Sequence, residues 1–260
     1  MTATTISLDG VSSTSIPEIE IENVTRQIVP TLRSSYLEVP GRSGSWRFEE
    51  AAGDRALSAT LAVIGDGLEA RRTAVRAVGR WLYAPSLRKL IVSDEPDRFV
   101  WADISEAPSA DELLARGRVP VVWRTGPFAE ATSITTEALT NVSTLFNVLP
   151  VVDHADEFVP SIEVTATGSL GSGFSLTLNG TTISYGGALV ASDVVTISSI
   201  SATVTTGADT DTELDGVFVG GSLAMTDVDG DFPTVVPGDN DFVFSGGSAT
   251  ISVRFRERFV

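Results

Sequence analysis

Apolar and polar residues alternate along much of this chain, and that pattern restricts its fold more than any other feature. Alternation over a few residues is typical of a strand with one buried face. In the first half it occurs at residues 19–22 and 57–63, and short strands are also predicted at 90–92, 98–104 and 119–123. The 260 residues therefore predict a mainly β protein.

In the second half the pattern is clearest on both sides of Asn179 and Gly180. Asn-Gly between two alternating segments is the strongest short signal for a β-hairpin, because both turn positions need a positive φ. Recurrent turn signals between the predicted strands indicate an antiparallel β-sandwich. These strands are expected at residues 162–164, 174–178, 183–185, 195–197, 217–219, 242–244 and 251–255.

One long segment follows the period of a helix instead, from residue 68 to about residue 83. Asp66 is predicted to cap it, with Glu69 in the place that completes a capping box, and Pro85 ends it. A single helix among antiparallel strands makes the first half α+β. The predicted apolar side consists of Leu68, Val75, Val78 and Leu82.

Charge is distributed unevenly along the chain. It carries 34 acidic and 18 basic residues, a formal net charge of −16. Residues 1–150 hold 15 basic and 19 acidic residues, a net of −4, whereas residues 151–260 hold 3 and 15, a net of −12. This composition shift predicts two domains.

The residue inventory argues against several kinds of chemistry. The chain has no cysteine and one histidine, His154, which removes disulfides, thiolate metal sites and mechanisms that need two histidines. The acidic excess argues against binding to nucleic-acid phosphates. No G-x-S-x-G or Walker sequence occurs, and no carboxylate pair stands out for glycoside hydrolysis. We therefore expect neither an enzyme nor a cofactor.

Alternating carboxylates at residues 227–231 look like the start of a calcium loop. Phe232 and Gly238, however, occupy the sixth and twelfth positions, where an EF-hand needs glycine and glutamate. A hairpin turn at Asp229–Gly230 and no metal site are the prediction. The acidic run at residues 209–215 is expected to be a solvated loop or strand face, and a weak surface calcium site built from both segments stays open.

The N-terminus, MTATTISLDG, has no basic start and no apolar core, so no signal peptide is predicted. No apolar run approaches the roughly 18–20 residues of a membrane span. A soluble protein made in a cytoplasm is expected. Tyr185 is the only Trp or Tyr of the second half, which disfavours a sugar-stacking platform there. The four tryptophans are predicted to be core residues: Trp46, Trp81, Trp101 and Trp123.

Four segments, taken in order, carry a family likeness. They are GRSG at 41–44, RKLIVSDEPDRFVWADI at 88–104, VVWRTGPFAE at 121–130, and GDFPTVVPGDNDFVFSGGSATISVRFRERFV at 230–260. Together they resemble the distal tail proteins of long, non-contractile bacteriophage tails. Residues 131–160 have no counterpart in this likeness.

The resemblance implies an architecture and a function. Residues 1–135 would form a β-barrel-like belt domain with one helix, packed into a six-membered ring. Residues 136–260 would form a galectin-like antiparallel β-sandwich on the outside. The ring would join the tail tube protein to the tail-tip hub protein, and DNA would pass through its centre. This implies a structural protein of the virion tail tip, made in the bacterial host cytoplasm, without catalysis, sequence-specific nucleic-acid binding or membrane insertion.

Two other functions are weighed against this one. The first alternative is a carbohydrate-binding module that contacts the host surface, and the second is a cell-wall hydrolase. The acidic charge also has two interpretations. Acidic residues that line the ring would speed the passage of DNA, or they would simply keep the outer sandwich soluble.

Two arginine clusters are candidate contact surfaces, because basic groups are scarce in so acidic a chain. Contact with an acidic partner or a neighbouring copy is the functional interpretation, and a solvated helix face is the simpler one. The candidates are Arg71, Arg72, Arg76 and Arg80 on the helix, and Arg254, Arg256 and Arg258 near the C-terminus.

Overall fold

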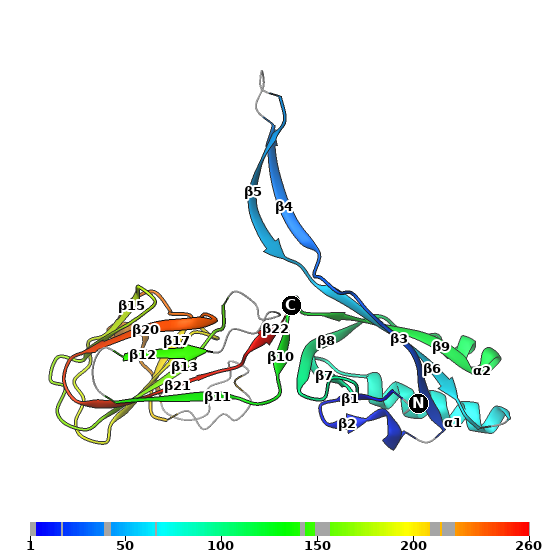
Figure 1. Ribbon diagram of the computed structural model, residues 1–260. Coiled ribbons are helices and arrows are strands. Elements are labelled where there is room, and N and C mark those ends of the chain that lie inside the picture. The colour runs from blue at the N-terminus through cyan, green and yellow to red at the C-terminus, as the bar shows by residue number, and fades with distance from the viewer. Residues whose placement is uncertain are drawn as a thin grey trace. The chain divides into compact units, whose positions relative to one another are not determined.

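The protein is described by a computed structural model, in which the chain forms two compact units, residues 1–132 and 133–259 (Figure 1). The boundary predicted from the sequence lies between residues 135 and 136. The structure describes residues 4–16, 18–38, 43–65, 67–140, 144–148, 157–208, 214 and 222–259.

The first unit is built on one antiparallel sheet with the strand order β2-β1-β7-β8-β9-β6-β3. Its strands are β1 (Ile6–Leu8), β2 (Val11–Ser12), β3 (Ile19–Arg26), β6 (Arg55–Val63), β7 (Arg88–Val92), β8 (Arg98–Glu106) and β9 (Arg118–Thr125). A short 3-10 turn, η1 (Ser13–Ser15), follows β2, and β10 (Ala129–Ala131) pairs with β8. The strands that alternation predicts in this half are confirmed.

The sheet of the first unit is open rather than closed into the expected barrel-like belt. Among the described strands of this unit, β3 pairs only with β6, and β2 pairs only with β1. Closing the sheet would require its two edge strands, β2 and β3, to pair with each other. Because β2 has only two residues, it offers few backbone groups for such hydrogen bonds.

Helix α1 (Leu68–Leu82) lies where the helical period predicts it. Its buried face joins Leu61, Val121 and Trp123 of the sheet in one hydrophobic core. Leu68, placed on the apolar side by the pattern, is 52% exposed. The predicted capping box is wrong, because the N-cap of α1 is Gly67, which has no side chain to accept a hydrogen bond. Asp66 lies outside the described residues, and Glu69 forms an ion pair with Arg72. The helix contributes Ala74, Val78, Trp81 and Leu82 to the core.

The first unit has a second helix, which corrects the expectation of a single helix in this half. Helix α2 (Ala110–Arg116) begins after Ser109, whose hydroxyl accepts a hydrogen bond from the Glu112 amide at 3.2 Å. It ends at Gly117, which has a φ of 68°. The sequence Ser-x-x-Glu that starts it is a capping box, but seven residues are too few to show a helical period.

Residues 32–52 form a hairpin with its own two-stranded sheet, which we call the arm. Strand β4 (Leu32–Glu38) pairs antiparallel with β5 (Ser45–Ala52). Figure 1 shows that the arm follows on from β3 and β6 and extends away from the sheet of the first unit. At its base, Gly53 donates to the Thr31 carbonyl at 2.6 Å, and a Cβ at Gly53 would lie 2.6 Å from the Thr31 hydroxyl.

The second unit is an antiparallel β-sandwich, as predicted. The strand order of one sheet is β11-β21-β13-β16-β17-β18, and that of the other is β12-β20-β14-β15-β19. Their bounds are β11 (Thr135–Thr140), β12 (Thr144–Val148), β13 (Ser161–Ala166), β14 (Phe174–Leu178), β15 (Thr181–Tyr185), β16 (Val194–Ser198), β17 (Thr203–Thr206), β18 (Ser222–Leu223), β19 (Val228–Gly230), β20 (Gly238–Ser245) and β21 (Ala249–Phe255). A short 3-10 turn, η2 (Met225–Asp227), precedes β19, and β22 (Arg258–Phe259) follows β21.

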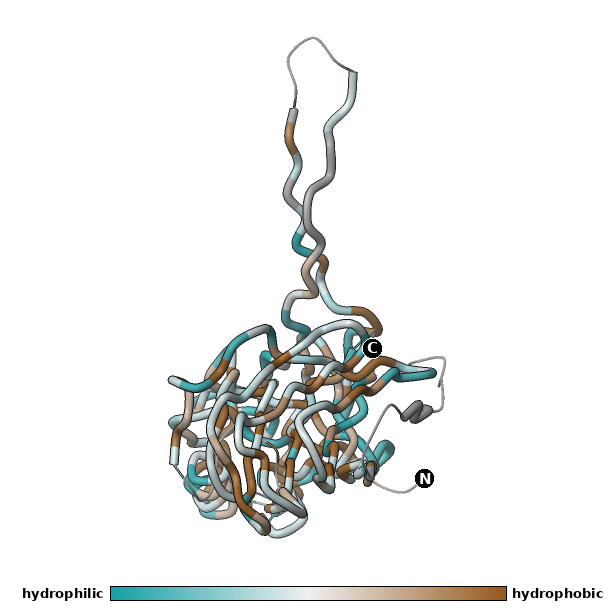
Figure 2. The backbone as a smooth tube through the Cα atoms, turned by 90° about the vertical axis from the view of Figure 1, so that its left-hand side faces the viewer, coloured by the Kyte–Doolittle hydropathy of each residue, from teal (hydrophilic) through white to brown (hydrophobic). Residues whose placement is uncertain are grey.

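Both sheets of the sandwich contribute to one core. Phe158 and Phe255 stack with their ring centroids 5.7 Å apart, and Phe174 packs against Phe244 at 5.6 Å. Brown, hydrophobic stretches alternate with polar ones along the strands in Figure 2. The strand predicted at 217–219 lies outside the described residues.

Two predicted turns of the sandwich had different outcomes. Asn179 and Gly180 join β14 to β15 with φ values of 52° and 82°, which confirms the hairpin. The hairpin turn predicted at Asp229–Gly230 is wrong, because both residues belong to β19 and pair with β15. Glycine is needed at position 230 for a different reason. A Cβ there would lie 2.2 Å from the Thr182 carbonyl oxygen.

A buried amide network ties the Asn179 turn to the start of β20. Asn240 is fully buried, and its Oδ1 accepts hydrogen bonds from the Asn179 side chain and the Val236 amide, both at 2.8 Å. Its Nδ2 donates to the carbonyls of Val236 and Gly238 at 2.8 and 3.0 Å. All the hydrogen-bonding capacity of this side chain is therefore used inside the protein.

Replacing Asn240 with alanine should destabilise the protein by about 2–4 kcal/mol, because several buried polar groups lose their partners at once. Urea denaturation followed by circular dichroism measures this change. Ser245→Ala, at an exposed position of the same strand, is the control and should change stability by less than about 0.5 kcal/mol. Equal effects of the two substitutions would contradict the role assigned to the network.

Candidate assembly surfaces

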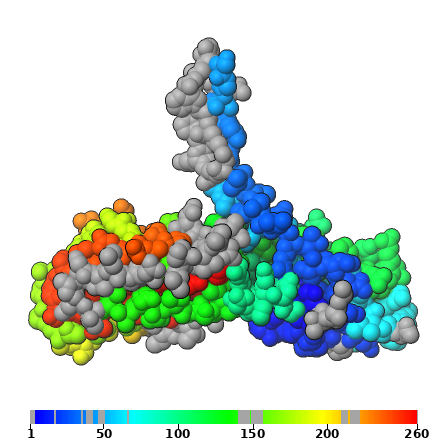
Figure 3. Space-filling view, viewed as in Figure 1, coloured from blue at the N-terminus to red at the C-terminus, as the bar shows by residue number. Residues whose placement is uncertain are grey.

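The arm presents apolar side chains to solvent. Tyr36 is 64% exposed and Leu37 is 52% exposed, although both lie within β4 and pair with residues of β5. Figure 2 shows hydrophobic stretches on the hairpin, and Figure 3 shows its described atoms standing clear of the sheet from which it extends. Among the side chains of the arm and its base that the structure describes, the exposed large apolar ones are Ile28, Val29, Leu32, Tyr36 and Leu37.

The arm has no net charge. Residues 32–52 contain three arginines and three glutamates. A neutral hairpin with apolar side chains along it is suited to contact another protein through hydrophobic burial rather than through charge.

The four arginines predicted to form a contact surface on α1, which we call the arginine stripe, fall into two groups. Arg71 is half-buried, and its guanidinium donates hydrogen bonds to the Leu114 and Ala115 carbonyls at 2.9 and 3.0 Å. These carbonyls belong to the last turn of α2, where a cation is favoured by the helix dipole. Arg71 is therefore a structural cap for α2 rather than a member of an open contact surface.

The other three arginines of α1 are exposed. Arg72 forms an ion pair with Glu69 at 2.7 Å on the same helix. Arg76 and Arg80 form no ion pair or hydrogen bond with any residue that the structure describes. The two lie four residues apart and so share one helix face.

The C-terminal arginines are not the unpaired basic cluster that the sequence suggested. Arg256 is only 6% exposed, and Arg254 and Arg258 are half-buried. All three already interact with other groups of the protein. Strand alternation would place these three arginines on one face, but β21 ends at Phe255 and Arg256 beyond it is buried, so they do not form one basic patch.

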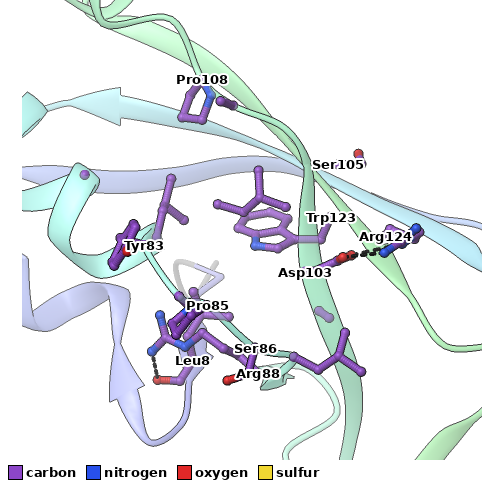
Figure 4. A pocket seen from close by; sticks show the side chains of 17 residues that line it. Leu8, Tyr83, Pro85, Ser86, Arg88, Asp103, Ser105, Pro108, Trp123 and Arg124 are labelled. Carbon is purple, nitrogen blue, oxygen red and sulfur yellow. Dashed lines mark hydrogen bonds and ion pairs between the residues drawn. The ribbon is translucent and has the colours of Figure 1, made fainter.

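A groove lies beside the C-terminal end of α1 and has a volume of about 930 Å³. Figure 4 shows Tyr83 and Pro85 on one side, Pro108 on the other, and the Trp123 indole between them. Tyr83 is 80% exposed and Leu87 is 57% exposed. The groove is lined by Leu8, Gly79, Leu82–Arg88, Ala102–Ser105, Ala107, Pro108, Trp123 and Arg124.

The charged groups at the edge of the groove are already paired. Arg124 donates two hydrogen bonds to the Asp103 carboxylate, at 3.1 and 2.5 Å, and this contact raises the pKa of Arg124. Arg88 donates to Asp9 at 2.6 Å and to the Leu8 carbonyl at 2.9 Å. The groove therefore offers apolar contact surface to a ligand, while the charges around it are largely neutralised.

The aromatic residues do not form a described sugar-binding platform. Tyr185 is 6% exposed and packs against Phe174, and burial, followed by the nearby Asp227 and Asp193 carboxylates, raises its pKa. Trp81 and Trp123 are buried, as predicted. Trp101 is only half-buried, and the side chain of Trp46 lies outside the described residues.

Within the described ranges, no group of three or more His, Asp or Glu side chains is placed to hold a metal ion. His154 and residues 209–213 and 215 lie outside those ranges. No helix in the described part of the chain is long and apolar enough to cross a membrane.

Two family models match separate parts of the chain, one in each half. One, described as a phage tail protein RIFT-related domain, matches residues 15–119, and the other, the C-terminal domain of a siphovirus-type tail component, matches residues 156–259. No curated protein sequence matches the chain.

A solved structure shares the fold at low sequence identity. The crystal structure of the Dit protein of phage SPP1, described as a paradigm of the hub adsorption apparatus in phages that infect Gram-positive bacteria, is 16% identical. The two chains match over 99% of each, with a TM-score of 0.73. A chain from the activated baseplate of phage P2 with Ca is 8% identical over 97% of each chain, with a TM-score of 0.47.

The two parts of the arginine stripe should respond differently to mutation. Arg71→Ala removes two charge-assisted hydrogen bonds to α2 and should destabilise the protein by about 1–3 kcal/mol. Arg76→Ala, on the exposed part of the same helix, should change stability by less than about 0.5 kcal/mol. Urea denaturation measures both, and a large loss for Arg76→Ala would show that this arginine also has a structural partner.

Proposed function

Because the chain belongs to the distal tail protein family of siphoviruses, we propose that six copies form a closed ring that joins the tail tube to the tail-tip hub and lets DNA pass through its centre. In this role the protein acts through contact surfaces at the tip of the virion tail. A ring of identical copies needs two different, complementary surfaces on each copy, so that every contact is head-to-tail.

The observation that carries this proposal is the arm. A two-stranded hairpin by itself is marginally stable in water, and it needs a further surface to bury its apolar side chains. The arm forms a sheet of its own and keeps Tyr36 and Leu37 exposed. A neighbouring copy in the ring would supply the missing surface, and each copy would in turn receive the arm of the next.

The apolar area available on the arm is large enough to support such a contact. Fully burying one large apolar side chain is worth about 1.5–3 kcal/mol. The five exposed apolar side chains of the arm and its base would together contribute on the order of 10 kcal/mol before the costs of association. Repeating that contact at every interface of a closed ring would make the assembly much more stable than an isolated pair.

The ring proposal also accounts for the second unit and for the acidic charge. The sandwich would lie on the outside of the ring, away from the channel. Most of the net charge, −12 of −16, belongs to residues 151–260 and would keep the outer sandwich soluble. The net −4 of residues 1–150 would suit a channel through which DNA moves without being held, since acidic groups do not bind phosphates.

We expect the purified protein to form hexamers, alone or with its tail tube and hub partners, with a mass of six times the 27.4 kDa of one chain. The double substitution Tyr36→Asp with Leu37→Asp should prevent this, because two carboxylates cannot be buried unpaired in an apolar contact. Mass photometry measures the oligomeric state, and thermal unfolding of the monomer should be unchanged.

Val190→Asp is the matched control, because Val190 is 63% exposed but belongs to the second unit. This variant should still assemble. Hexamers that persist in the arm variant would rule out the arm as the ring contact. A wild-type protein that stays monomeric with both partners present would overturn the ring itself.

A further inference from the structure

The outer face of α1 carries three exposed arginines, two of which have no acidic partner among the residues that the structure describes. Arg76 and Arg80 are exposed and unpaired among the described residues, and Arg72 lies one turn before them with a single ion pair to Glu69. The formal charge of the whole chain is −16, so an exposed row of cations is unusual for this protein. We call Arg72, Arg76 and Arg80 the basic face.

The basic face leads directly to the groove. Tyr83 follows Arg80 by three residues, at the end of α1, and is one of the groove-lining residues. Tyr83 and Leu87 are exposed on one wall, and Ile104 and Pro108 are half-buried in the groove lining. Along the chain, the arginines of α1 are therefore followed by residues that line the groove. Figure 4 shows Tyr83 at this end of the groove.

We propose that the basic face and the groove together bind an acidic segment of another protein, with carboxylates on the arginines and an apolar side chain in the groove. This inference goes beyond the ring, because it assigns a second surface and a different class of partner. Charge complementarity selects the acidic part of the segment, and the groove selects the apolar residue that follows it.

The spacing suits an extended segment. Residues four apart on a helix rise by about 6 Å along its axis. Alternate residues of an extended chain are about 6.6 Å apart and point to the same side. Two or three acidic residues in alternate positions would therefore match successive arginines of the basic face. The apolar side chain of the bound segment that enters the groove, which we call the apolar anchor, would follow these acidic residues by a few positions. It would lie beside Tyr83 and Leu87.

Two other occupants fit less well. The projecting part of this chain is the arm, and its net charge of zero does not complement the basic face. Nucleic acid is disfavoured because binding through phosphates needs many cations, whereas the surrounding protein is strongly acidic. An acidic segment of a different protein satisfies both the charge and the shape of the site.

The test is a fluorescence anisotropy titration of the full-length protein. The probe is a labelled peptide in which three aspartates alternate with serines and are followed by Gly-Phe-Leu. We expect micromolar binding by the wild type. Arg76→Ser with Arg80→Ser should bind about tenfold more weakly, and Leu87→Ser about fivefold. Replacing the aspartates of the peptide with asparagines, or its Phe-Leu with Ala-Ala, should cause similar losses.

Matched controls separate this site from general effects. Arg116→Ser removes an exposed arginine from α2, and Val190→Ser removes an exposed apolar side chain from the second unit. Both variants should bind the peptide as the wild type does. Circular dichroism confirms that each variant is folded before it is titrated.

Several results would overturn the proposal. These are no binding by the wild type at 100 µM peptide, unchanged binding by the arginine double variant, and equal binding of a peptide without the apolar anchor. Tighter binding of a duplex DNA would identify a nucleic-acid surface instead. Loss of the wild-type oligomer in the arginine variant would show that the surface belongs to a contact between copies. The arm substitutions, by contrast, should leave peptide binding unchanged, so this proposal and the ring can fail independently.

Discussion

The arm is the part of this structure whose apolar side chains cannot be buried within its own two-stranded sheet. Burial of apolar side chains is the main favourable term in folding, and a two-stranded hairpin has only two strands with which to achieve it. The rest of the first unit gives this hairpin a rigid base, because β3 and β6 are held in one sheet and α1 packs on that sheet. The first unit thus positions an apolar surface that only a second molecule can bury.

Chemically similar arginines have different roles in this protein because of what surrounds each one. Arg71 is held by two carbonyls at the end of α2, whereas Arg76, one turn and a half along the same helix, is in solvent. Arg256 is buried close to the C-terminus. The number of arginines in a segment therefore says little about its contact surface, and the local carbonyl and carboxylate acceptors decide which cations stay available.

Sequence periodicity was a reliable guide where an element was long and had one consistently buried face. This applies to α1, to the strand that contains Leu61, and to the Asn179–Gly180 hairpin. It failed where the deciding contact came from a distant part of the chain. Gly230 looks like a turn residue, yet the Thr182 carbonyl of a neighbouring strand explains it. Helix α2 is too short for periodicity, although its Ser109 capping box is visible in the sequence.

The sequence by itself determined the β-rich class, the main helix, the sandwich of the second half and the absence of thiol chemistry, and its ordered motifs indicated the tail-protein family. These properties follow from local periodicity, turn chemistry and residue counts, all of which depend only on the sequence itself. Only the tertiary structure decided that Tyr36 and Leu37 lie on an exposed arm, that Arg76 and Arg80 have no partner within the described part of the chain, and that a groove lies at the end of their helix. Exposure and pairing depend on groups distant in sequence, so no local pattern specifies them.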